Sequence, residues 1–257
     1  MPPYTTVLFD MFDTLVRLNR ERLPRIRLGG REVHSSVACL YPVAASALPG
    51  VTADRFYEAF LGSYRDAESR RGVDHREIPA LERFEFCYAR LGVDPAALPP
   101  GLTERLIDLH AGCLAGVAES LPGRHELLEW LTGRYRLGLV SNFDYSPTVW
   151  RILRDSGLED RFEVVVVSDA VGWRKPSARI FETAFARLGV GARECLFVGD
   201  RPDIDVAGAQ AVGMAAAWLN PDGAALPNGI ADPDFTLESL ADLRPALERR
   251  EARSPRS

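Results

Sequence analysis

The sequence predicts an α/β protein in which a doubly wound, five-stranded parallel sheet is interrupted by a mainly α-helical domain. Two observations predict this fold. Short apolar runs of strand length alternate with amphipathic segments of helix length, and this order is typical of a parallel sheet with helices on both faces. A long segment after the first apolar run, residues 17–119, does not alternate in this way.

The apolar runs are the predicted strands of the sheet, and four of the five are followed directly by polar residues. Because ligands of open α/β sheets bind beyond the carboxyl ends of the strands, these ends are the candidate site. The predicted strands are residues 4–9, 137–140, 164–167, 195–198 and 215–219. The predicted helices between them are residues 125–132, 146–155, 177–188 and 203–212.

The inserted segment predicts a small hairpin followed by helices. Residues 25–28 and 31–33 flank Gly29 and Gly30, a pair that suits a two-residue turn with positive φ angles. Helices are expected at residues 35–48, 53–70, 78–91 and 102–114. The predicted domains are therefore a discontinuous core, 1–16 and 120–257, and a helical domain, 17–119. The charged, proline-containing tail at 249–257 is expected to be frayed.

Composition excludes several classes of function. The formal net charge is −5, which offers no basic surface for nucleic acid or for an anionic membrane. No apolar run approaches the roughly 18 residues of a membrane-spanning helix, and the first residues do not resemble a signal peptide. The four cysteines are scattered, so we expect free thiols in a cytoplasmic protein rather than disulfides or metal ligands. The oligomeric state is not indicated.

Four short motifs, in order along the chain, resemble those of the haloacid dehalogenase superfamily. The first motif is Phe9-Asp10-Met11-Phe12-Asp13-Thr14, and Ser141-Asn142 corresponds to the second. Lys175-Pro176 corresponds to the third, and Gly199-Asp200 with Asp205 to the fourth. The resemblance covers the predicted core, whereas the helical segment matches only in size and position and would be the cap domain of such a protein. It implies a hydrolase, with a phosphatase that acts on a small phosphorylated metabolite as the first expectation.

The chemistry of a phosphatase assigns a role to each of these residues. Asp10 would be the nucleophile, because a carboxylate can attack phosphorus and form an acyl phosphate that water then cleaves. Thr14, Ser141 and Asn142 would surround the transferring group, and Lys175 would offset its negative charge. Mg²⁺ would be held by carboxylate and carbonyl oxygens, which are its preferred ligands. The expected metal set is Asp10, the carbonyl of Phe12, Asp200 and, behind them, Asp205.

Each residue also has an ordinary structural interpretation. An Asp at the end of a strand is often a turn or helix-cap residue, and a single Lys is usually a solvated surface charge. These interpretations do not explain why all the sites fall at one edge of one predicted sheet. Lys175 is also the only lysine in a chain in which arginine is otherwise the basic residue. The combination therefore favours a catalytic site.

The sequence departs from the family pattern at Phe12. In phosphatases of this family the residue two positions after the nucleophile is normally an Asp that protonates the leaving group. The loss of a general acid typically costs about 10²–10⁴ in rate. Three alternatives stay open. The first is a Mg²⁺-dependent phosphatase that takes its acid from the cap or from water, or that prefers substrates with good leaving groups. The others are a carbon–halogen hydrolase and a binding protein with little or no activity. Dehalogenases of the family carry an aromatic residue at this position, but they lack the Gly-Asp that stands here as Gly199-Asp200.

Overall fold

The structure is a computed structural model that describes residues 4–253 of the chain, and it divides into two compact units. The first unit contains residues 1–17, 119–143 and 153–257, and the second contains residues 18–118 and 144–152. This division differs from the expected domains chiefly at residues 144–152, which the sequence places in the predicted core. Asp144 anchors this stretch in the second unit, because its carbonyl accepts a hydrogen bond from the backbone of Ala80 at 2.7 Å.

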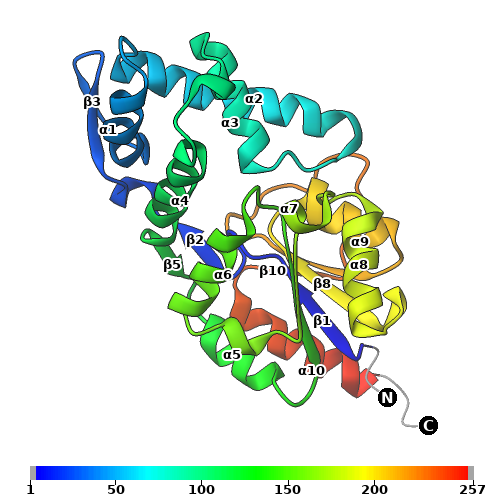
Figure 1. Ribbon diagram of the computed structural model, residues 1–257. Helices are drawn as coiled ribbons and strands as arrows, with labels where there is room; N and C mark the ends of the chain where they lie inside the picture. The colour runs from blue at the N-terminus through cyan, green and yellow to red at the C-terminus, as the bar shows by residue number, and fades with distance from the viewer. Residues whose placement is uncertain (1–3, 254–257) are drawn as a thin grey trace. The chain divides into compact units, whose positions relative to one another are not determined.

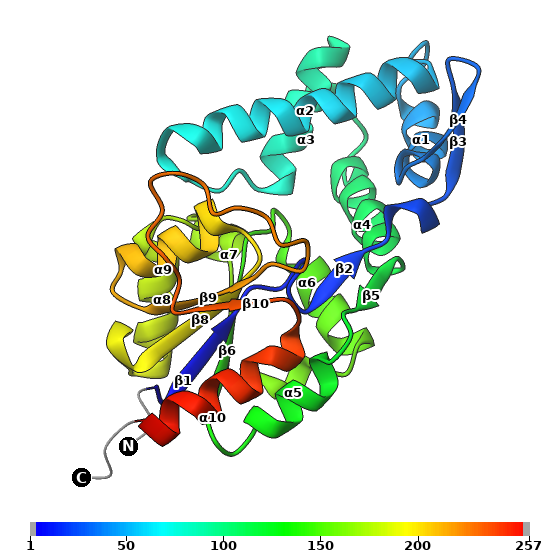
Figure 2. The same cartoon turned by 180° about the vertical axis from the view of Figure 1, so that it is seen from behind.

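The first unit is built on a parallel sheet (Figures 1 and 2). In the part of the chain that the structure describes, its six strands lie in the order β10-β9-β8-β1-β6-β7. The central strand β1 pairs on both sides, with Phe9 level with Leu139 on one neighbour and with Val198 on the other. The strands are β1 (Thr6–Phe9), β6 (Arg136–Ser141), β7 (Val164–Val167), β8 (Cys195–Gly199), β9 (Ala215–Leu219) and β10 (Phe235–Leu237).

Helices cover both faces of this sheet, as expected for a doubly wound fold. Figures 1 and 2 show α8 and α9 on one face and α5 and α10 on the other. The α8 face buries Leu8, Phe181 and Phe197 in one apolar cluster, which explains why β1 and β8 are apolar almost throughout. The helices are α5 (Arg124–Leu131), α6 (Ser146–Asp155, which crosses the boundary between the units), α7 (Ser168–Val171), α8 (Ala178–Leu188), α9 (Ala207–Ala211) and α10 (Leu243–Arg253).

Three local features of the first unit differ from the sequence prediction. The predicted sheet had five strands, but the three-residue strand β10 adds a sixth beside β9, through Phe235 level with Ala217. The expected helix at 203–212 is instead a π-helical turn, Pro202–Val206, followed by the short α9. The tail predicted to be frayed from residue 249 continues α10 as far as Arg253, and residues 254–257 lie outside the described part. Strands and turns this short give too little periodicity to be recognised.

The second unit contains the predicted hairpin and four helices. Strands β3 (Arg25–Leu28) and β4 (Arg31–His34) pair antiparallel around Gly29 and Gly30, whose φ angles of +54° and +80° confirm the predicted turn. Phe56, Phe60 and Phe84 lie in the apolar core of the unit. The helices are α1 (Val37–Ala47), α2 (Ala53–Asp74), α3 (Ala80–Leu91) and α4 (Leu102–Ala115). Where the chain passes from one unit to the other, the strands β2 (Val16–Leu18) and β5 (Ala118–Ser120) form a separate two-stranded sheet.

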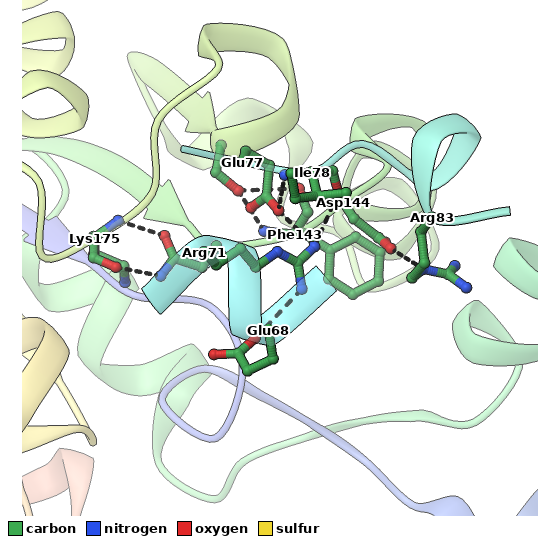
Figure 3. A network of polar contacts seen from close by, with 10 residues as sticks. Glu68, Arg71, Glu77, Ile78, Arg83, Phe143, Asp144 and Lys175 are labelled. Carbon is green, nitrogen blue, oxygen red and sulfur yellow. Dashed lines mark hydrogen bonds and ion pairs between the residues drawn. The ribbon is translucent and has the colours of Figure 1, made fainter. Parts of the chain in front are cut away.

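Buried arginines organise the polar contacts of the second unit (Figure 3). The guanidinium of Arg83 is fully buried, and its Nε donates to Asp144 at 2.6 Å. The same guanidinium stacks over the ring of Tyr64 at 3.9 Å. Arg71 forms a second buried pair with Glu77 at 2.6 Å. Each buried arginine needs a carboxylate partner, because an isolated charge in an apolar interior is strongly unfavourable.

Within residues 4–253, none of the helices is both long and apolar enough to cross a membrane.

Candidate active site

The sheet brings the predicted site residues to one edge. Asp10 follows β1 directly, Ser141 ends β6, and Asp200 follows β8. Because Phe9 of β1 is level with Leu139 and Val198 of its two neighbours, these three ends lie at nearly the same height. Lys175 approaches from the loop between α7 and α8. The residues therefore converge where the carboxyl ends of parallel strands create a ligand site.

A buried ammonium group lies between two buried carboxylates at the centre of this edge. Lys175 Nζ donates to Asp10 Oδ1 and also contacts Asp205 Oδ1 at 2.8 Å. Only 2% of the Lys175 side chain and 2% of the Asp205 side chain are exposed, so water screens these charges poorly. The ammonium also lies 4.9 Å from the centre of the Phe197 ring. Lys175 is thereby held against Asp10 by contacts on several sides.

Burial and mutual repulsion change the protonation of these carboxyl groups. Burial raises the pKa of Asp10 to about 7, with Lys175 acting in the opposite direction and the carboxylates of Asp205 and Asp200 adding to the rise. Burial and the charge of Asp205 raise the pKa of Asp200 to about 6. Burial disfavours the charged form of Lys175, but Asp10 and Asp205 outweigh it and raise its pKa. The site thus concentrates more negative charge than one lysine can neutralise.

Asp205 takes its place because Gly199 has no side chain. A Cβ atom built on Gly199 would lie 2.3 Å from Asp205 Oδ2, a distance that no real Cβ tolerates. The same Oδ2 accepts a hydrogen bond from the backbone N–H of Arg201 at 3.1 Å. The π-helical turn at Pro202–Val206 presents Asp205 to the strand end in this orientation. Gly199 therefore has a steric role, because its lack of a side chain admits Asp205 to the strand end.

The remaining predicted residues take different positions. Thr14 is buried, and its hydroxyl lies 3.5 Å from Asp200 Oδ1. Asn142 holds the backbone of Lys175 from both sides: its Nδ2 donates to the Lys175 carbonyl at 2.9 Å, and its Oδ1 accepts from the Lys175 N–H at 2.7 Å. The Oγ atom of Ser141 is buried and has no hydrogen-bond partner among the described residues. Asn142 thus positions Lys175, whereas Ser141 retains a donor for a ligand.

Phe12 has an aromatic partner that sequence reasoning did not identify. Its ring stacks on Phe143, with the ring centres 5.0 Å apart and the planes at 27°. Phe12 lies three residues beyond the end of β1, and Phe143 lies two residues beyond the end of β6. The side chain at position 12 is therefore part of an apolar wall beside Asp10 and offers no group that can transfer a proton.

A small cavity of about 200 Å³ lies over the site within the first unit. Its lining includes Asp10, Phe12 and Lys175, and also Arg174 and Arg201, which sequence reasoning missed although each is adjacent to a motif residue. Arg201 is paired through two hydrogen bonds with Asp203. The arginines place further positive charge around a cavity that an anion could enter.

A second, larger cavity of about 790 Å³ adjoins the first. Both cavities are lined in part by Asp13 and Asp200, and the larger one extends past Trp218 and Leu240. Its volume falls within the roughly 300–1,000 Å³ of small-molecule sites. The two cavities together provide a charged compartment and a wider, more apolar one.

The donor set of the small cavity fits a hard divalent cation. Asp10, Asp200 and Asp205 each offer a carboxylate oxygen, and these oxygens lie within 4.8 Å of one another. Oxygen ligands of this kind suit Mg²⁺. Burial is the main cause of the raised pKa values of Asp10 and Asp200, and the neighbouring carboxylates add to the rise, so a cation would offset the negative charge of this group.

A family model described as a haloacid dehalogenase-like hydrolase matches residues 4–213. A pyrimidine 5′-nucleotidase of Escherichia coli strain K12 is 33% identical over 166 residues, which is 64% of this chain and 69% of that protein. A crystal structure of a phosphatase of the same family from Thermococcus onnurineus is 26% identical with a TM-score of 0.65, over 95% of this chain and 97% of that one. A 2-haloacid dehalogenase from Pseudomonas syringae pv. Tomato DC3000 shares the fold, with 24% identity and a TM-score of 0.68 over 96% and 99% of the two chains.

Proposed function

Because the chain belongs to the haloacid dehalogenase-like hydrolase family, we propose that it is a Mg²⁺-dependent phosphatase of a small phosphorylated metabolite. One observation carries the proposal: Lys175 is buried between Asp10 and Asp205, at the strand edge where Asp200 adds a third acidic group. Such a group of carboxylates suits a divalent cation, which a dehalogenation does not require. The similarity to a nucleotidase and to a family phosphatase supports the same reaction class.

Asp10 would carry the phosphoryl group. Its Oδ atom attacks phosphorus, the bond from phosphorus to the leaving oxygen breaks, and an acyl phosphate forms on Asp10. Lys175 keeps its proton and offsets the charge on Asp10 and on the transferring oxygens. Water then attacks the acyl phosphate and releases inorganic phosphate, which restores the Asp10 carboxylate.

Other groups of the site would hold the metal ion and orient the substrate. Asp10, the Phe12 carbonyl and Asp200 would hold Mg²⁺, with Asp205 behind them. When bound, this ion supplies charge that offsets the phosphoryl oxygens. The hydroxyl of Ser141 would donate to a phosphoryl oxygen, because nothing in the described chain engages it. The organic part of the substrate would occupy the larger cavity beside Asp200.

Phe12 determines which substrates we expect. Without a carboxyl group at this position, the leaving oxygen must take its proton from another group or from water, or stabilise its own charge. We therefore propose that the enzyme prefers phosphate esters with good leaving groups, such as aryl or acyl phosphates.

The experiment is a panel of phosphate esters and 2-haloacids. Each compound is assayed once with 5 mM Mg²⁺ and once with a chelator. We expect phosphate release that depends on Mg²⁺, and loss of about 10³-fold or more of kcat in Asp10→Asn. Beryllium fluoride should bind the wild type as a phosphoryl mimic, as judged by fluorine NMR, and should not bind Asp10→Asn. Turnover of esters that is equal in both variants would refute the role of Asp10.

The metal assignment has its own matched control. Asp200→Asn should weaken Mg²⁺ binding at least tenfold by calorimetry, because it removes a charged ligand. Asp203→Asn changes a nearby carboxylate that is paired with Arg201 on the surface, and its Mg²⁺ affinity should equal that of the wild type. Equal affinities in all three proteins would place the ion elsewhere.

A second candidate function is carbon–halogen hydrolysis. The stacked pair of Phe12 and Phe143 beside Asp10 favours it, since halide leaves without a proton. In that reaction Asp10 attacks carbon and the ester intermediate is hydrolysed. Release of halide from 2-haloacids in the presence of chelator, without release of phosphate from any ester, would establish this function. Turnover of neither substrate class would indicate a binding protein.

A further inference from the structure

Two cysteines of the second unit meet across a helix pair. Cys113 Sγ donates to Cys39 Sγ at 2.8 Å, although the residues are 74 positions apart in the chain. Cys39 lies in the first turn of α1, and Cys113 lies in the last turn of α4. Both side chains are partly exposed. The other two cysteines, Cys87 and Cys195, are fully buried.

A second contact between α1 and α4 lies about one helical turn from the two cysteines. His110 Nδ1 and Ser36 Oγ are 2.8 Å apart, and each precedes one of the two cysteines by three residues. The opposite ring nitrogen of His110 lies 2.7 Å from the hydroxyl of Tyr64. Because residues three apart lie on the same side of a helix, this buried network holds the two sulfur atoms in register. The approach of the thiols is therefore built into the packing of α1 against α4.

The contact between the two sulfur atoms gives them different roles. Cys39 Sγ accepts the S–H of Cys113, so we assign the first reaction with an oxidant to Cys39. Burial, together with the contact to Cys39, raises the pKa of Cys113 to about 12. Cys113 therefore stays protonated and donates its S–H to Cys39.

We propose that Cys39 and Cys113 form a redox-active pair that a hydroperoxide converts to an intramolecular disulfide. The Cys39 sulfur attacks one oxygen of hydrogen peroxide, the O–O bond breaks, the thiol proton passes to the departing hydroxyl, and Cys39 becomes a sulfenic acid as water leaves. The Cys113 sulfur then attacks the sulfur of Cys39, the S–O bond breaks, the Cys113 thiol proton passes to the departing hydroxyl, and a second water leaves. Two thiols and one peroxide thus give one disulfide and two waters, and sulfur supplies both electrons. The sulfur atoms need to close from 2.8 Å to about 2.0 Å.

The pair would be a modification site of the second unit, separate from the phosphatase chemistry proposed for the first. The disulfide closes the long loop between residues 39 and 113 and joins α1 to α4 covalently. A bond that closes a loop of this length stabilises the folded state, chiefly by restricting the unfolded chain. It would be reversed by a dithiol reductant.

The test treats the full-length protein, reduced and then freed of reductant, with one to five equivalents of hydrogen peroxide. Remaining thiols are alkylated under denaturing conditions, and tryptic peptides are analysed by mass spectrometry. Cys39 lies in the peptide 32–55 and Cys113 in the peptide 106–124, so a linked product identifies the pair directly. We expect this linked peptide, at a rate that does not depend on protein concentration.

Variants and stability separate the proposal from other oxidations. Cys39→Ser and Cys113→Ser should each abolish the linked peptide, whereas the controls Cys87→Ser and Cys195→Ser should retain it. Oxidised wild type should unfold roughly 5–10 °C higher than the reduced protein, and oxidised Cys113→Ser should show no such rise. Four freely alkylated thiols after peroxide, a disulfide between two molecules, or sulfinic acid at Cys39 without a linked peptide would each overturn the proposal.

Discussion

The substitution Gly199→Ala tests whether the close packing of Asp205 on the strand end creates the site. The new Cβ would lie 2.3 Å from Asp205 Oδ2 and 2.5 Å from its Cβ and Cγ atoms. Asp205 is a short side chain on a residue that is 1% exposed, so no flexible end can move aside. Asp205 must therefore shift away from the strand end, and its contacts with Lys175 and with the backbone of Arg201 must lengthen.

The expected loss of stability follows from the contacts that the displacement of Asp205 disrupts. Overpacking a close-packed interior costs about 1–3 kcal/mol of unfolding free energy. Removing one partner of a buried ion pair costs about 3–5 kcal/mol, an upper limit that applies if Asp205 leaves Lys175 completely. We expect a loss between these limits, near 3 kcal/mol. Activity should fall about 100-fold or more, because Lys175 would no longer be held against Asp10.

Urea denaturation followed by circular dichroism measures the first effect, and initial rates on an aryl phosphate measure the second. Gly72→Ala is the matched control, because a Cβ at this helical glycine meets no atom within 4 Å. This control should be neutral or more stable by about 0.5–1 kcal/mol, since Ala is the better helix residue. A Gly199→Ala protein with the stability and rate of the wild type would refute the steric argument.

Three further predictions concern the acid, the metal and the second unit. Phe12→Asp should raise the hydrolysis of alkyl phosphates more than that of aryl phosphates in steady-state assays, because poorer leaving groups depend more on a proton donor; an equal increase would argue against this role. The apparent affinity for Mg²⁺ should weaken as pH falls from 8 to 5.5. The reason is that Asp10 and Asp200, with pKa values of about 7 and about 6, bind protons in this range and must be ionised to hold the metal. Calorimetric affinities that do not change with pH would contradict this prediction. Arg83→Met should cost about 3–5 kcal/mol of stability by leaving Asp144 unpaired, and the double variant with Asp144→Asn should recover part of this loss in urea denaturation.

Local pattern was sufficient to predict the alternating strands, the hairpin and the order of the motifs. The run of valines at residues 164–167 was predicted with its observed bounds, and the two glycines at 29 and 30 specified their turn through positive φ angles. These features depend on residues that are close in the chain, where periodicity and turn geometry are informative. The acidic and basic residues that follow the strands could be identified for the same reason.

Contacts between distant residues could be decided only by the tertiary structure. The sequence contained Lys175 and Asp205 but not their ion pair, nor the way Asn142 holds the Lys175 backbone. The strand Phe235–Leu237 is too short to show a period, and it becomes a strand only because the edge of β9 is available for pairing. Cys39 and Cys113 looked like unrelated thiols until the packing of α1 and α4 brought them together. Each of these contacts is set by the register of packed elements, which local periodicity does not encode.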